Sequence, residues 1–329
     1  MSELRWNPTL EQWTITATHR QNRTFLPPAD FCPLCPTKPG APEEYVTDVP
    51  ASSYDIAIIE NKFPSLKTPA AVPVVEGTDL YPVAPSDGVC EVVLYTQEHN
   101  STLTQQPLYR LERLIRVWQE RYTDLGSRPE VDYVFIFENK GKVIGVTIDH
   151  PHGQIYAYPF VPPTAKTELE AARKHLEKTG RRLWDDIVAA EIEDGRRIVA
   201  QNDTWIAFIP FYARYPYEVH LMPKRPVSKI TDLTEAERWD MARNLKTVLQ
   251  KLDNLFGFSM PYMMVMHQAP TDGGEYDFYR FHIEFYVPHR TETKLKYLAG
   301  SESGAGVFIN DTLPEEKAAE LRKVEPVTE

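Results

Sequence analysis

The apolar and polar positions of the first half of the chain predict four strands and one helix. Strands are predicted at 53–59, 91–95 and 133–137, and a fourth begins at the histidine pair His150 and His152. After the second strand, apolar residues recur at spacings of three and four, which predicts a helix with one buried face. The residues of this face are Leu108, Leu111, Ile115, Trp118, Tyr122 and Leu125.

The second half of the chain repeats this succession. Strands are predicted at 205–210, 217–222, 262–266 and 281–287. A helix between the second and third of these strands starts at a capping box, Thr234 with Glu237. Its buried face consists of Met241, Leu245, Val248, Leu249 and Leu252. The charged segment between the halves, 164–190, also predicts a helix.

Both halves therefore have the order strand, strand, helix, strand, turn, strand. This repetition predicts a duplicated α+β unit, in which a mainly antiparallel sheet is flanked by helices. We place the two halves at 1–163 and 164–329 and expect their sheets to pair within one subunit.

Composition narrows the classes of partner. The 329 residues carry a net charge of -11, which argues against nucleic acid because phosphate binding needs a basic face. An anionic small molecule stays compatible with this charge if a cleft gathers a few cations. No apolar run approaches the roughly 20 residues of a membrane span, and no signal-peptide pattern opens the chain. With three cysteines, an odd number, we expect a cytoplasmic protein.

The segment His150-Pro151-His152-Gly153-Gln154 holds the principal candidates for chemistry. On a strand, positions two apart face the same side, so both imidazoles and the Gln154 amide share one face. Proline favours a strand start, and glycine lets another group approach the backbone closely. Three polar side chains on one strand face are costly in a core. We therefore interpret the segment as an active site, the alternative being two structural histidines.

Histidine suits nucleophilic attack on phosphorus. A neutral imidazole is available near pH 7, and the phosphoramidate that it forms can pass the group on. Attack by one ring nitrogen requires the other to hold the proton, usually against a backbone carbonyl. We expect the segment 145–149 to supply that carbonyl.

These segments also carry a family resemblance. Phe137-Glu-Asn-Lys-Gly141, then Gly145, then the pentapeptide at 150–154 resemble the galactose-1-phosphate uridylyltransferases, a branch of the histidine triad superfamily. The resemblance extends from Arg5 to Glu302 and implies a duplicated histidine-triad-like fold. It also implies a ping-pong reaction of galactose metabolism. In that reaction UDP-glucose uridylylates His152, glucose 1-phosphate leaves, and galactose 1-phosphate takes the uridylyl group to give UDP-galactose.

Gln154 stands where histidine triad hydrolases have a third histidine. Glutamine can donate a hydrogen bond to a phosphate oxygen, but it cannot shuttle a proton for water. A covalent intermediate would then survive to meet a second substrate, which favours transfer over hydrolysis. By the resemblance, His152 is the nucleophile and Gln154 holds the phosphoryl oxygens.

The resemblance also implies metal sites. Cys32-Pro-Leu-Cys35 alone fits a zinc pair or a redox dithiol. In the resembled family such a pair joins two histidines around a structural zinc, and the matching set is Cys32, Cys35, His99 and His150. A second metal, zinc or iron, is implied for Glu168, His267, His282 and Glu284, although the family has histidine at the last position. The alternative for this second set is a hydrogen-bonded polar cluster without metal.

Several positions match substrate contacts of the resembled family. The matching residues are Arg20 and Arg23 for phosphates, Asn61 for the nucleoside, Asn139, Gly145 and Thr147 for the diphosphate, and Lys296 and Glu302 for the sugar. The chain departs from the family at Lys62, Ser301 and Phe308, which leaves the base and the hexose open. Because the family's sugar-binding stretch reaches the partner's site, the resemblance implies a homodimer.

Two other functions are compatible with these residues. The departures from the family allow adenylyl transfer or phosphorolysis with ADP-glucose, which a panel of nucleotides would distinguish. A non-catalytic, zinc-stabilised binding protein would never release hexose 1-phosphate. We interpret His220, on an apolar strand, as a satisfied core histidine.

Overall fold

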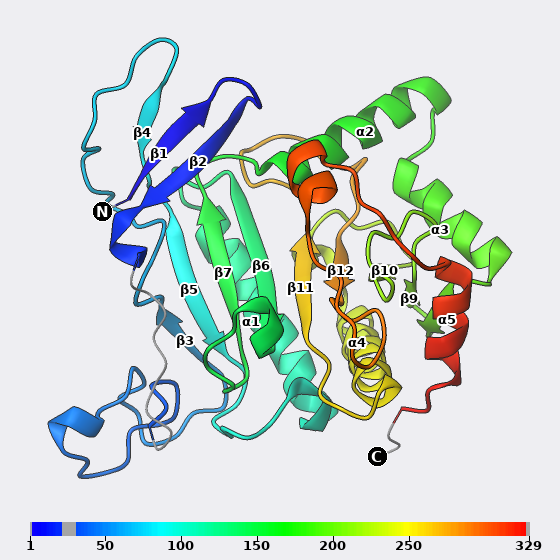
Figure 1. Ribbon diagram of the computed structural model, residues 1–329, viewed down its shortest axis with the longest axis horizontal. Coiled ribbons are helices and arrows are strands. Elements are labelled where there is room, and N and C mark those ends of the chain that lie inside the picture. The colour runs from blue at the N-terminus through cyan, green and yellow to red at the C-terminus, as the bar shows by residue number, and fades with distance from the viewer. Residues whose placement is uncertain (1, 22–30, 327–329) are drawn as a thin grey trace.

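One large antiparallel sheet organises the protein. The structure, a computed structural model, describes residues 2–21 and 31–326. Within these residues, nine strands pair in the order β3-β5-β7-β6-β11-β12-β10-β9-β8 (Figure 1). In that order the strands are Ala57–Glu60, Val89–Leu94, His152–Tyr158, Tyr133–Lys140, Tyr262–His267, His282–Tyr286, Val219–Pro223, Trp205–Phe208 and Ile198–Gln201.

The order of the strands shows the same arrangement twice. Four strands of the first half lie as β3-β5-β7-β6, and four of the second half lie as β9-β10-β12-β11, so each set has its last strand between its second and third. The ninth strand, β8, pairs with β9 at the edge of the sheet. The halves meet where β6 pairs with β11, with Phe137 opposite Val265. This arrangement confirms the predicted α+β class with a mainly antiparallel sheet. The division of the chain at 163 and 164 stays a prediction.

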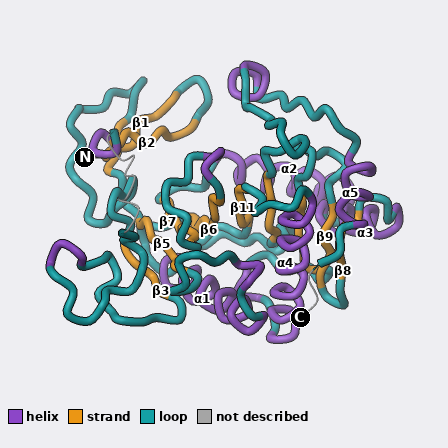
Figure 2. Tube along the Cα trace, turned by 60° about the horizontal axis from the view of Figure 1, so that its bottom comes forward, coloured by secondary structure: helices purple, strands orange, loops and turns teal. Residues whose placement is uncertain are grey.

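Two long helices cover one face of the sheet. They are α1, Leu108–Gly126, and α4, Glu235–Leu255, which contact each other on the same side of the strands (Figure 2). The apolar stripes predicted for both helices lie in the main core, together with strand residues such as Ile136 and Ile155. The capping box predicted at the start of α4 is confirmed, because Thr234 and Glu237 exchange hydrogen bonds. Because α1 and α4 cover one face of the sheet, the candidate active-site side chains lie on the other face.

The segment between the halves is helical, as predicted, and contains two helices. They are α2, Pro163–Thr179, and α3, Leu183–Asp194. Gly180 separates them at a φ of 71°, a left-handed conformation that ends a helix and favours glycine. Trp184 and Leu169 of this pair pack with Phe208 and Tyr279 in a second core.

The remaining elements are peripheral. A three-stranded sheet that the sequence pattern did not predict consists of β1, Ser2–Asn7, β2, Gln12–Ala17, and β4, Val83–Pro85. The last helix, α5, spans Pro314–Lys323 and contacts α4. Among the described residues, no helix combines the length and apolarity that crossing a bilayer requires.

Candidate active site

A cleft at one end of β6 and β7 gathers the residues that the sequence singled out. His152 and Gln154 face the same side of β7, and Phe137 lies opposite Gln154 on β6. The predicted phosphate and nucleoside contacts line the same cleft, namely Arg20, Asn61, Asn139, Gly145 and Thr147. Arg23 lies outside the described residues. The structure therefore brings together nearly all of the candidate nucleotide-binding positions.

The charge of the cleft differs from that of the whole chain. Arg20, Lys38 and Lys142 line it, whereas the chain carries a net charge of -11. Gly145 turns the backbone at its rim with a φ of 87°, a conformation that side chains rarely adopt. Local cations and an exposed backbone suit a phosphate-bearing ligand despite the acidic surface.

The geometry of His152 is that of a nucleophile. Its Nδ1 donates to the carbonyl oxygen of His150 at 2.7 Å, which leaves Nε2 with its lone pair. Burial lowers the pKa of the ring, although that hydrogen bond acts in the opposite direction. The imidazole is thus kept neutral and held in one tautomer. The prediction that 145–149 would supply the carbonyl was wrong, because the ring folds back over the residue two positions before it.

Gln154 is oriented by a neighbour that the resemblance had already suggested. The Nδ2 of Asn61 donates to the Oε1 of Gln154 at 3.4 Å. Asn61 is itself held after β3, where its backbone N–H donates to Cys90. With its oxygen occupied, Gln154 can offer its amide N–H groups to an anionic ligand beside His152.

Next to the cleft, Cys32, Cys35, His99 and His150 converge, with ligand atoms all within 4.8 Å of one another. The Nδ1 of His150 lies 3.9 Å from the Sγ of Cys32 and 3.6 Å from the Sγ of Cys35, and His99 is also 3.6 Å from Cys35. A tetrahedral zinc with ordinary bond lengths places nitrogen and sulfur about 3.6 Å apart. The donor set and its spacing therefore fit a closed zinc site.

Hydrogen bonds outside the cluster orient His150. Its Nε2 donates to the carbonyl oxygen of Thr96 at 2.8 Å, so that Nδ1 faces the sulfurs. Tyr54, which the sequence reasoning missed, places its hydroxyl 2.7 Å from the same nitrogen and donates to Leu34. The only sequence signal for Tyr54 was its place in the run at 53–59, whose first residues precede β3 and approach the cluster instead.

Comparison with known proteins agrees with this geometry. A family model described as galactose-1-phosphate uridyl transferase, N-terminal domain, matches residues 1–162, and the model of the C-terminal domain matches 168–328. A galactose-1-phosphate uridylyltransferase from Thermotoga maritima is 40% identical over 99% of both chains. The chain belongs to the galactose-1-phosphate uridylyltransferase family.

Solved structures are similar to this family member over its whole length. One described as a uridylyltransferase has a TM-score of 0.87 at 36% identity and covers 98% of both chains. An ADP-glucose phosphorylase from Arabidopsis thaliana has a TM-score of 0.73 at 23% identity, over 99% of this chain and all of that one. The second likeness shows a shared fold alone.

The second half of this uridylyltransferase-family chain repeats the histidine geometry at a buried position. His282 opens β12 as His152 opens β7, and its Nδ1 donates to the carbonyl of Arg280, again two residues earlier, at 2.9 Å. Its Nε2 is buried and has no hydrogen-bond partner among the described residues. Trp184 of α3 lies against the ring, with centroids 4.4 Å apart. The helices α2 and α3 thus cover a histidine whose counterpart in the first half lines the open cleft.

Three of the four residues predicted for a second metal, His282 among them, lie close together. The ligand atoms of Glu168, His267 and His282 lie within 4.8 Å of one another, and His267 Nδ1 is 2.9 Å from Glu168 Oε2. Burial disfavours the charge of His267, but Glu168 and Glu284 raise its pKa to about 9. These three donors could hold a cation.

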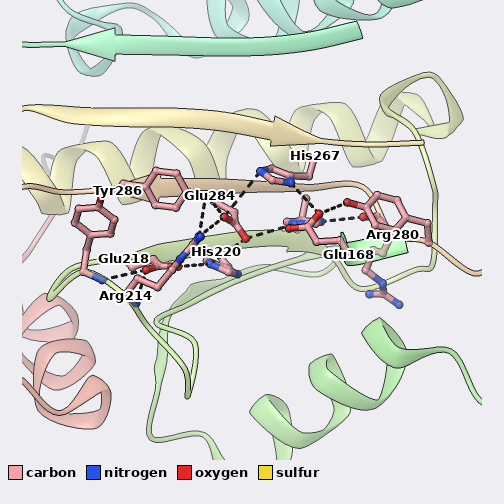
Figure 3. A network of polar contacts seen from close by, with 11 residues as sticks. Glu168, Arg214, Glu218, His220, His267, Arg280, Glu284 and Tyr286 are labelled. Atoms are coloured by element: carbon pink, nitrogen blue, oxygen red, sulfur yellow. Dashed lines mark hydrogen bonds and ion pairs between the residues drawn. The ribbon is translucent and has the colours of Figure 1, made fainter. Parts of the chain in front are cut away.

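The fourth residue, Glu284, connects these donors to a second group (Figure 3). Its carboxylate lies 2.9 Å from Arg214 Nη2 and 3.2 Å from His220 Nε2, and Glu218 completes that group. Glu284 also lies 3.6 Å from His282 Nε2 and 3.9 Å from His267 Nε2, so the four predicted residues are neighbours and their shared ion stays a prediction. His220 was predicted to be an ordinary core histidine. It is buried, but it lies between two carboxylates because it pairs directly across the sheet with Glu284. Sequence reasoning missed Arg214 and Glu218.

Replacing Arg214 with methionine should destabilise the protein by roughly 3 kcal/mol, because it leaves two buried carboxylates without their cation. Glu218 and Glu284 both lie within 3.3 Å of this guanidinium and are nearly inaccessible to solvent. Urea unfolding measures the effect. Arg196→Met, which removes an exposed arginine paired with Asp194, is the control and should change the free energy of unfolding little. Equal stability of the two variants would contradict the assigned role of Arg214.

The predicted sugar-binding residues do not line the cleft of the same chain. Lys296 and Glu302 pair with each other at 3.0 Å, and Lys296 also donates to the carbonyl of Ile309 at 2.6 Å. Phe308 lies against Arg214, whose Cζ is 5.5 Å from the centroid of the phenyl ring. Lys62 lies 3.5 Å from Asp48. The contacts of Lys296, Glu302 and Phe308 hold the C-terminal segment outside the chain's own cleft.

Proposed function

We propose that this protein transfers a uridylyl group from UDP-glucose to galactose 1-phosphate by a ping-pong reaction through His152. The observation that carries the proposal is the hydrogen bond from His152 Nδ1 to the carbonyl of His150, at 2.7 Å, because it leaves Nε2 as the nucleophile in the cleft. Membership in a family whose curated members carry the name galactose-1-phosphate uridylyltransferase supports it.

The reaction has two balanced steps. In the first, the Nε2 lone pair of His152 bonds to the α-phosphorus of UDP-glucose, and the bond from that phosphorus to the bridging oxygen breaks, releasing glucose 1-phosphate. In the second, a phosphate oxygen of galactose 1-phosphate bonds to the same phosphorus and the bond to nitrogen breaks, giving UDP-galactose. Neither step requires a proton to cross from water, which suits a site without a third histidine.

The cleft residues hold the substrate during these steps. We assign the amide of Gln154 and the side chains of Asn139 and Thr147 to the phosphate oxygens, and the backbone at Gly145 to the close approach of the diphosphate. Arg20 and Arg23 supply positive charge to the phosphates, and Asn61 contacts the nucleoside while it orients Gln154.

Zinc is the ion that we propose for Cys32, Cys35, His99 and His150, since two thiolates and two imidazoles form a typical structural site. It would hold His150 and with it the carbonyl that His152 uses. For Glu168, His267, His282 and Glu284 we propose a second zinc or iron, with Glu284 paired to Arg214 as well.

The wider setting of the enzyme is also a proposal. Lys296 and Glu302 would bind the sugar in the cleft of a second copy, which makes the working form a homodimer. We further propose two domains, 1–163 and 164–329, a cytoplasmic location, and no nucleic-acid partner.

Labelled nucleotide tests the function directly. Incubation with UDP-glucose labelled at the α-phosphate should leave acid-labile label on His152 and release glucose 1-phosphate. A panel of nucleotide sugars, with galactose 1-phosphate or inorganic phosphate as acceptor, identifies the base and the acceptor. Absence of label would exclude the covalent mechanism, and turnover confined to ADP-glucose would replace the uridylyl donor by an adenylyl donor.

Replacing Gln154 with histidine should convert part of the transfer into hydrolysis. An imidazole at this position can accept a proton from water, so the uridylyl-enzyme should hydrolyse about tenfold faster or more relative to transfer. The measurement is the ratio of UMP to UDP-galactose formed from the isolated labelled enzyme. Gln154→Met, which removes the hydrogen-bond donor without adding a base, should slow both outcomes and leave their ratio unchanged. If Gln154→His left the ratio unchanged, the role given to glutamine would be wrong.

A further inference from the structure

A buried cluster lies on the far side of the sheet from the cleft, directly behind His152. It consists of Tyr95, Glu138 and Tyr262, which are 1%, 5% and 2% exposed. Side chains alternate along β6, so Asn139 faces the cleft while Glu138 faces the helices with Ile136. None of the substrate contacts proposed above involves this cluster, and its hydroxyls and carboxyl therefore need another explanation.

Glu138 is a buried carboxyl whose pKa lies above its ordinary value. Burial raises its pKa to about 7, although Lys140 acts in the opposite direction. Tyr262 donates to Glu138 Oε1 at 3.0 Å, while Glu138 Oε2 and the hydroxyl of Tyr95 are buried without a hydrogen-bond partner of standard geometry among the described residues. Glu138 also lines a cavity together with Pro151 and His152. A buried carboxyl at this place is costly, so its position next to the nucleophile's segment requires a compensating role.

Tyr95 contacts the nucleophile's segment at two points. Its backbone N–H donates to the carbonyl of Pro151 at 3.1 Å. Its hydroxyl lies against the backbone of Gly153, so that a Cβ at Gly153 would lie only 2.0 Å from that oxygen. Gly153 was predicted to let another group approach the backbone closely. That group is the hydroxyl of Tyr95.

The neighbouring residue holds the other end of the same segment. Thr96 accepts a hydrogen bond from His150 Nε2, and the carbonyl of His150 in turn accepts one from His152. Residues 95 and 96 therefore fix the backbone from 150 to 153 on both sides of His152. Thr96 holds His150, and Tyr95 contacts Pro151 and Gly153. A tilt of this short backbone would move Nε2 of His152 relative to the phosphorus that it attacks.

We propose that Tyr95 and Glu138 are positioning residues for the nucleophile. Glu138, which accepts a hydrogen bond from Tyr262, lies beside the phenol of Tyr95. Tyr95 fixes the backbone from Pro151 to Gly153, and that backbone sets the direction of His152 Nε2. This inference rests on the proposed function, in which His152 carries the uridylyl group.

Two conservative variants test it in single-turnover reactions with UDP-glucose. Tyr95→Phe removes one hydroxyl, and Glu138→Gln keeps the shape of the side chain. Each should slow uridylylation of His152 about tenfold while the dissociation constant of UDP-glucose changes less than about twofold, because substrate contacts are intact. The control is Tyr133→Phe, another fully buried tyrosine of the same sheet, whose hydroxyl accepts from the Gln268 N–H at the other end of β6. It should leave the rate unchanged.

A coupled pair of variants separates positioning from general loss of stability. Gly153→Ala should nearly abolish uridylylation, because its methyl group collides with the hydroxyl of Tyr95. Adding Tyr95→Phe should restore part of the rate, although a ring carbon of Tyr95 still lies 2.9 Å from the new Cβ. Thermal unfolding of every variant shows whether it is folded.

Failure of the inference differs from failure of the function. If wild type takes no label from UDP-glucose, the proposed function is wrong. If wild type is labelled but Tyr95→Phe and Glu138→Gln react at its rate, only the positioning role is overturned. A loss of rate that merely follows the loss of stability, equal in Tyr133→Phe, would overturn it as well.

Discussion

Replacing His152 with alanine should lower the rate of transfer by about four orders of magnitude or more, because no other group can carry the uridylyl intermediate. The only described hydrogen bond of its side chain is to the carbonyl two residues earlier, so its removal breaks no contact between distant elements. The variant should therefore fold and still bind UDP-glucose. Rapid-mixing assays of hexose 1-phosphate release, with the nucleotide's dissociation constant measured separately, test both parts of this expectation.

A second histidine variant provides the comparison. His175 bonds to Asp186 between α2 and α3 and does not line the cleft, so His175→Ala should retain transfer. Exchange of labelled glucose 1-phosphate into UDP-glucose without galactose 1-phosphate is the signature of a ping-pong intermediate, and His152→Ala should lack it. Exchange in that variant at the wild-type rate would show that another residue carries the uridylyl group.

The fold class was predictable because burying one face of a helix or strand makes apolar residues recur at a regular spacing along the sequence. Apolar residues at spacings of three and four along α1 and α4, and alternating burial along β6 and β7, follow from covering one face of one sheet. Boundaries were less predictable. The run at 53–59 has the right alternation, yet the ladder of β3 begins only at Ala57, because Tyr54 is occupied with His150. Pairing partners, not the pattern alone, determine where a strand starts.

The site was predictable where the residues that carry the chemistry are close together in the sequence. The pentapeptide at 150–154 predicted a nucleophile, His152, and a phosphate ligand, Gln154, and the structure places both side chains in one cleft. Contacts between distant residues were harder to predict. Arg214 and Glu218 compensate Glu284 across the sheet, and Tyr95 approaches Gly153 from another strand. Such residues have no local spacing that distinguishes them from ordinary charged or aromatic positions.

The metal cluster joins three segments that are distant in the sequence, and its loss should have the second large effect. Cys35→Ser removes the sulfur that lies 3.6 Å from both His99 and His150. Without the ion, the segment around 32–49 loses its main link to the sheet, because its apolar core is small, with Leu34 and Val49 packed on Leu94. We expect the unfolding temperature to fall by about 10 °C, since a structural zinc contributes several kcal/mol even in part.

The same variant should lower the rate of uridylylation about a hundredfold, because the carbonyl that orients His152 belongs to His150, a proposed zinc ligand. Metal analysis of the purified protein should show one zinc fewer per chain than in wild type. Cys90→Ala is the matched control, since Cys90 is buried beside Ser65 and lies outside the cluster. That control should keep the zinc content and the rate of wild type. Full zinc content in Cys35→Ser would contradict the assigned ligands. A wild-type rate without the ion would instead show that the backbone around His150 holds its geometry unaided, and that the zinc serves the stability of the fold alone.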